Sequence, residues 1–179
     1  PQIVSSAHDN GQTVGGRSVL DLIQRLIGDP PRTAERIAES ERKDVELARI
    51  HYRIAWAAYR SGEFQAATSS AEELLQPGLR TLSLEAGAKM KRDAVEIISD
   101  ALYEQNEESS IKETFSRKSL VNSVGAIAKE MALRYSAAGI HHRVESVVDL
   151  ALNAAPMAPE VPDLLAIQAS SFRRQNRNG

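Results

Sequence analysis

The chain has 179 residues and no cysteine, which excludes disulfide bonds and thiolate metal sites. Its formal net charge of −2 gives no electrostatic reason to expect nucleic acid or an anionic membrane surface as a partner. Aromatic residues make up only 4% of the chain, so Leu, Ile, Val and Ala must fill the interior, as suits closely packed helices. No apolar run approaches the roughly 18 residues that span a membrane, and we expect no direct membrane insertion.

The first part of the chain predicts a lead-in followed by two helical segments. Residues 1–17 are rich in Ser, Asn, Asp and Gly with little periodicity, and we interpret them as a flexible lead-in. An apolar helical face over residues 18–28 ends at a Gly and is followed by two prolines. Thr33 is expected to cap the next helix, which extends to about residue 61. No Gly or Pro interrupts residues 33–61, and the sequence does not decide whether they form one helix or two.

The rest of the chain predicts helices separated by Gly and Pro. After a turn at Gly62, helices are expected over 64–76, over 83–105, and from a capping box at Ser110 and Glu113 to about Val121. Three more are expected over 124–138, over 140–155, and from Pro159 or Pro162 to about Arg174. No segment sustains a period of two, so the sequence predicts an all-α protein.

Residues 48–77 carry a pattern at fixed spacing. Ile54 and Ala55 form a large-then-small apolar pair, followed by a turn glycine at Gly62, an aromatic residue at Phe64 and a small residue at Ala67. This pattern resembles a tetratricopeptide repeat. A second segment, residues 125–158, is similar in spacing: it has the pair Met131-Ala132, a Gly at 139 and a terminal Pro at 156.

The resemblance implies a definite architecture for residues 18–179. Antiparallel helix hairpins would stack as a short right-handed superhelix, an α-solenoid. The implied repeats cover about 48–81, 91–124 (degenerate) and 125–158, with a half-repeat at 159–174. The uneven units also resemble those of large bacterial proteins of this family, and the chain starts at Pro1. We therefore expect a fragment of a longer bacterial protein, and the periplasm, the cytoplasm and association with the cell envelope all stay open as its location.

The resemblance also implies where a partner would lie, because ligands of this family usually occupy the concave groove lined by the first helices. The side chains carried over to that groove are Arg49, Tyr52, Arg53, Trp56, Tyr59 and Arg60, extended by Arg92 and Lys129. Tyr, Trp and Arg dominate interface hot spots, and an aromatic, basic groove suits a peptide with acidic side chains. Two other interpretations stay open: the three aromatic residues can be core anchors, and the cations can belong to a solvated helix face.

The sequence therefore predicts a protein–protein interaction scaffold that binds a protein or peptide, with no catalytic residues, cofactor or metal. The adjacent pair His141-His142 is not expected to bind a metal ion, because neighbouring side chains on a helix point about 100° apart. The alternative function is a structural segment that stacks on neighbouring repeats without a groove ligand. For either function, exposed terminal repeats predict self-association.

Overall fold

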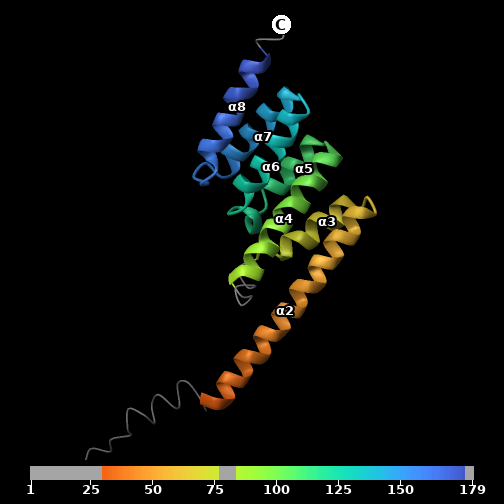
Figure 1. Cartoon of the computed structure of the whole chain (residues 1–179), viewed down its shortest axis with the longest axis vertical. Coiled ribbons are helices and arrows are strands. Elements are labelled where there is room, and N and C mark those ends of the chain that lie inside the picture. Colours follow the sequence, from red (N-terminus) through yellow and green to blue (C-terminus); the bar gives the residue numbers. More distant parts are fainter. Residues whose placement is uncertain (1–29, 77–83, 176–179) are drawn as a thin grey trace, which may run out of the picture. The chain divides into compact units, whose positions relative to one another are not determined.

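The computed structural model describes residues 30–76 and 84–175 of a chain that divides into two units, Pro1–Ser40 and Glu41–Gly179 (Figure 1). The helix expected over residues 18–28 lies outside the described residues. In the first unit, residues 30–40 are helical and begin α2, Pro30–Arg60. Thr33 is therefore inside α2 and not at its N-cap, since Pro at the first helical positions loses no hydrogen bond. The stretch 33–61 contains one continuous helix.

The second unit contains α2 from Glu41 onward and six further α-helices among the described residues. They are α3 (Phe64–Glu73), α4 (Leu84–Gln105), α5 (Glu108–Phe115), α6 (Val124–Ala137), α7 (His141–Ala154) and α8 (Val161–Gln175). A short 3-10 helix, η2 (Lys118–Leu120), lies between α5 and α6. No strand occurs in the described ranges, so the all-α prediction is confirmed for them.

The predicted capping box before α5 is wrong. Glu107 occupies the N-cap of α5, and Ser110 lies inside the helix, where its hydroxyl donates to the Glu107 carboxylate at 3.3 Å. The helix begins early because Asn106 adopts a φ of 51° and reverses the chain within a very short turn. It also ends at Phe115 and not near Val121, because the backbone becomes extended at Arg117 before η2.

Two turn glycines have the left-handed backbone conformation that the sequence pattern requires. Gly62 (φ 78°) joins α2 to α3, and Gly139 (φ 74°) joins α6 to α7. At both turns the glycine N–H bonds back to a carbonyl three residues earlier, at 3.1 Å and 3.2 Å. The next N–H bonds to a carbonyl five residues earlier, at 2.9 Å and 2.8 Å. This pair of hydrogen bonds closes the end of a helix. It favours Gly, because a residue without a Cβ adopts the left-handed conformation without steric strain.

The core of the second unit is rich in alanine, as the low aromatic content predicts. Ala55 and Ala67, expected as the small residues of a hairpin, are both fully buried. Larger side chains complete the interior on α4 and α6, including Leu102, Met131 and Tyr135. Small buried side chains allow helix backbones to approach closely, and they explain how few aromatic residues the interior needs.

The helices of the second unit pack in a regular order (Figure 1). α3 packs on α4, α4 on α6, and α6 on both α7 and α8. α5 contacts α4 and α7, and α7 contacts α8. No helix in the described ranges is both long enough and apolar enough to cross a bilayer.

Candidate binding groove

Three aromatic side chains form a row along the last turns of α2. Tyr52 and Trp56 meet edge to face with ring centroids 6.5 Å apart, and Trp56 and Tyr59 do so at 6.0 Å. Spacings of four and three residues place the rings on one helix face, and edge-to-face pairs are favourable. All three are half-buried and pack against the hydrophobic core. The row therefore anchors α2 with one side and presents aromatic surface with the other.

The arginines of α2 flank this row. The guanidinium of Arg60 lies 5.8 Å from the centroid of the Trp56 ring, within the range of a cation–π contact. Arg49 and Arg53 are exposed, and the described residues supply no ion-pair partner for either. The structure thus brings Arg60 onto the aromatic row and leaves Arg49 and Arg53 facing solvent.

Arg92 and Lys129 line a hollow of about 610 Å³ between α4 and α6, which extends to Glu160 before α8. Arg92 is exposed, whereas Lys129 donates a hydrogen bond of 2.6 Å to Asp163 at the start of α8. The Tyr52 hydroxyl donates to Asp93 at 3.1 Å, and Asp93 also lines the hollow. This bond connects the aromatic row of α2 with the hollow. We call the two together the groove.

The structure adds carboxylates that sequence reasoning had not assigned to the groove. Asp100 is 9% exposed and forms an ion pair with Arg134 of α6. Glu96 and Glu104 lie one turn to either side of Asp100 on α4 and are exposed. The groove therefore carries both signs of charge, in contrast to the basic groove expected from the sequence. The sequence shows acidic residues spaced three and four apart along residues 93–104. It does not show which face of α4 meets α2.

The charged groups of this region act on one another's ionisation. Burial raises the pKa of the Asp100 carboxyl, and the attraction of Arg134 only partly opposes the rise. Burial also raises the pKa of the Tyr59 phenol, helped by the nearby Asp100 and Glu104 carboxylates. One side chain from each of α2, α4 and α6 thus meets in a single electrostatic cluster.

The histidine pair lies away from this groove. His141 Nδ1 is 2.7 Å from the Ser171 hydroxyl of α8, and His142 is exposed. Among residues 30–76 and 84–175, no group of three or more His, Asp or Glu side chains is arranged to hold a metal ion.

The groove offers aromatic faces, exposed cations and exposed carboxylates, which are groups for recognition. Comparison of the chain with protein-family models, curated proteins and solved structures finds no match.

Proposed function

We propose that this chain is a non-catalytic scaffold of the tetratricopeptide type that holds a partner peptide or protein in its groove. The observation that carries the proposal is the aromatic row of Tyr52, Trp56 and Tyr59, with Arg60 against Trp56 and a hollow of about 610 Å³ alongside. Half-exposed Trp, Tyr and Arg beside a concavity are typical of interface hot spots.

The turn geometry supports a repeat architecture. Gly62, Asn106 and Gly139 each have a positive φ and each stands between two helices of a hairpin. Asn106 and Gly139 lie 33 positions apart, close to the period of about 34 residues of a tetratricopeptide repeat. Asn tolerates the left-handed conformation better than other non-glycine residues, so Asn106 replaces the turn glycine in the degenerate middle repeat.

The packing order supports the same proposal. In a stack of helix hairpins, first helices pack on first helices and second helices on second helices. The contacts α4–α6 and α6–α8 follow the first rule, and α5–α7 follows the second. In this arrangement α2, α4 and α6 are the first helices that line the groove.

The charges of the groove narrow the chemistry of the partner. Arg60 and Arg92 provide exposed positive charge, while Glu96 and Glu104 provide exposed negative charge. A segment with apolar or aromatic side chains and both acidic and basic residues would complement this surface. A uniformly acidic segment would meet the carboxylates of α4 and bind less well.

The test is selection of a random displayed peptide library on the immobilised chain, with affinities measured by calorimetry. Arg60→Glu and Arg92→Glu change exposed side chains, so both should weaken peptide binding and leave the melting temperature unchanged. Hot-spot truncation exceeds about 2 kcal/mol, so Trp56→Ala should weaken binding about 30-fold. Phe172→Ala, at an aromatic residue on α8 that is 41% exposed, is the matched control and should bind normally. Selected peptides whose affinity is indifferent to all three groove variants would contradict the proposal.

A specific surface favours a second candidate function, a structural segment that stacks on neighbouring helices. Leu47, Ile50 and Ile54 of α2 are 49%, 51% and 46% exposed and lie three and four residues apart. This spacing forms one apolar stripe on the helix. Mass measurement by light scattering tests it: self-association that disappears in Ile50→Glu, with the helix content retained, supports stacking through α2. A monomer at all concentrations contradicts stacking of one copy on another.

A further inference from the structure

A second hollow, with no lining residue in common with the groove, lies where α5 and η2 meet the end of α7. Its volume is about 480 Å³. The apolar part of its lining consists of Phe115, Val121, Leu150 and Ala154. Phe115 is almost fully buried, whereas Val121 is 45% exposed. The hollow therefore has a fixed apolar floor that opens to solvent at Val121.

The apolar surface continues beyond this hollow. An adjoining hollow of about 280 Å³ shares Val121 and Ala154 with the first and extends to Met157. Met157 is 92% exposed, which is unusual for a large apolar side chain. Together the two hollows form an apolar strip that reaches from Phe115 to Met157 and is longer than one side chain.

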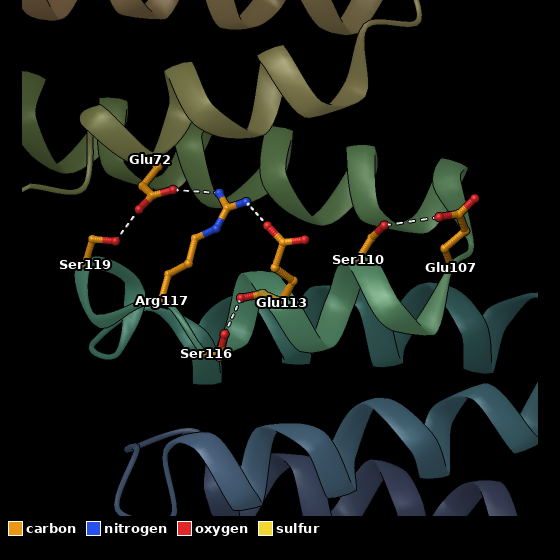
Figure 2. A network of polar contacts seen from close by, with 7 residues as sticks. All are labelled: Glu72, Glu107, Ser110, Glu113, Ser116, Arg117 and Ser119. Carbon is orange, nitrogen blue, oxygen red and sulfur yellow. Dashed lines mark hydrogen bonds and ion pairs between the residues drawn. The ribbon is translucent and has the colours of Figure 1, made fainter.

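Three cations lie at the rim of the first hollow, and only one of them has carboxylate partners among the described residues. Lys112, Arg117 and Lys118 line it, and no carboxylate does. The Arg117 guanidinium donates to Glu72 at 2.9 Å and to Glu113 at 3.0 Å, so its charge is matched (Figure 2). Lys112 and Lys118 are exposed, and no ion pair or side-chain hydrogen bond reaches them from the described residues. Two free lysines thus flank the apolar floor.

The wall that carries Lys118 is held in place before any ligand arrives. Glu72 of α3 accepts hydrogen bonds from Arg117 and from the Ser119 hydroxyl, on either side of Lys118 (Figure 2). The Ser116 hydroxyl donates to the Glu113 carbonyl at 2.6 Å. These bonds tie η2 to α3 and to the end of α5. A preformed wall lowers the entropy that binding must overcome.

We propose that this strip binds a short acidic peptide segment in which large apolar side chains are flanked by Asp or Glu. The apolar side chains would occupy the floor at Phe115 and Leu150, and the carboxylates would meet Lys112 and Lys118. The two lysines come from different helices, which suits carboxylates spaced along a peptide better than the single head group of a fatty acid. The site is independent of the groove and of its proposed partner.

The probe is a blocked, fluorescein-labelled peptide with a Leu-Phe pair flanked on both sides by Glu, titrated by anisotropy with the full chain. Binding tighter than about 1 mM is expected, and it should weaken with added salt because exposed charges are screened. Reversal of both lysines, Lys112→Glu with Lys118→Glu, should weaken binding at least about tenfold. Val121→Asp should weaken it similarly, because it places a carboxylate at the mouth of the apolar hollow.

Matched controls separate this site from general electrostatics. Arg173→Glu with Arg174→Glu reverses two exposed cations in the last turn of α8 and should leave the affinity within twofold. The same peptide with Gln in place of Glu should bind at least tenfold more weakly. Melting temperatures identify any variant that fails to fold, and the Gln peptide tests the proposal with the unaltered chain. The proposal would be overturned if the Glu peptide did not bind, if the Glu and Gln peptides bound equally, or if the lysine variant bound as the parent chain does. It would also be overturned if dodecanoate at equal concentration fully displaced the Glu peptide.

Discussion

The lack of a side chain at Gly125, in the first turn of α6, allows that helix to pack closely against the segment before α8. A Cβ added at Gly125 would lie 2.8 Å from the Ala158 Cβ and would also contact the Glu160 carboxylate. Carbon atoms pack at about 3.5–4.0 Å, so Ala158 must move by about 0.7 Å or more. The Glu160 carboxylate can swing aside, but the Ala158 methyl moves only with its backbone. Gly125→Ala therefore forces a backbone shift.

The sign of the effect follows from two opposing magnitudes. Replacing a helical Gly with Ala gains about 1 kcal/mol of helix propensity. Overpacking a tight contact costs about 1–3 kcal/mol, and the rigid Ala158 methyl places this contact in the upper half of that range. The net expectation is a loss of about 1–2 kcal/mol, or a melting temperature lower by about 2–8 °C.

The assay is thermal and urea unfolding of a double-mutant cycle with Ala158→Gly, which removes the obstructing methyl. Gly125→Ala combined with Ala158→Gly should recover stability beyond the sum of the two single changes, with a coupling of about 1 kcal/mol. A Gly125→Ala chain that is more stable than the parent, with no coupling to Ala158, would refute the reasoning.

Three further predictions concern the groove and its turn. Burial raises the pKa of Asp100 above its unfolded value, so the fold favours the protonated carboxyl. The contribution of this group to the free energy of unfolding is fully present below about pH 3.8 and is lost as pH rises through the folded pKa. Asp100→Asn should therefore leave the free energy of unfolding at pH 7 within about 1 kcal/mol of the parent value or raise it. Arg134→Met, which leaves the Asp100 carboxylate without its partner, should lower that free energy by about 2 kcal/mol. Urea unfolding measures both, and a large loss in Asp100→Asn would contradict this reasoning. At Gly62 a Cβ would meet nothing within 4 Å, but φ is +78°. Gly62→Ala should therefore lower the free energy of unfolding by about 1–2 kcal/mol, and Gly62→Asn should lower it clearly less. Equal melting temperatures of the two variants would argue against backbone strain. The Tyr59 phenol should titrate above pH 10, measured as the difference in absorbance at 295 nm between the parent chain with its four tyrosines and Tyr59→Phe. Tyr59→Phe should also remove part of the stability loss above that pH, and a difference midpoint at or below 10 would contradict the burial.

The helix pattern of this chain was predictable at the turn glycines and before Pro156, but not at Pro30, where α2 begins three residues before the predicted cap at Thr33. The turn at Gly62, the turn at Gly139 and the end of α7 before Pro156 lie within a residue or two of their predicted positions. The predictions failed around α5, where no Gly or Pro is present. The reversal there depends on Asn106 in a left-handed conformation, and the Tyr135 hydroxyl donates to its side chain at 3.2 Å. A contact with a residue far along the chain gives no local signal.

The candidate site was also predictable only where local spacing decides which side chains are neighbours. The row of Tyr52, Trp56 and Tyr59 was predictable, because neighbours on a helix follow from spacing alone. The acidic side of the groove was not, because the placement of Asp100 depends on which face of α4 meets its neighbours. The bond between Arg117 and Glu72 joins residues 45 positions apart and could not be inferred without the packing of α3 on the following segments.

Trp56 also has a practical consequence. It is the only tryptophan of the chain, and its indole ring lies between the edges of Tyr52 and Tyr59 with Arg60 against it. The tryptophan emission of the protein, excited selectively at the red edge of the absorption band, therefore reports on the groove alone. Because the chain has no cysteine, one cysteine introduced at any exposed position can carry a single acceptor dye. Energy transfer from Trp56 would then measure distances from the groove to the rest of the molecule in solution.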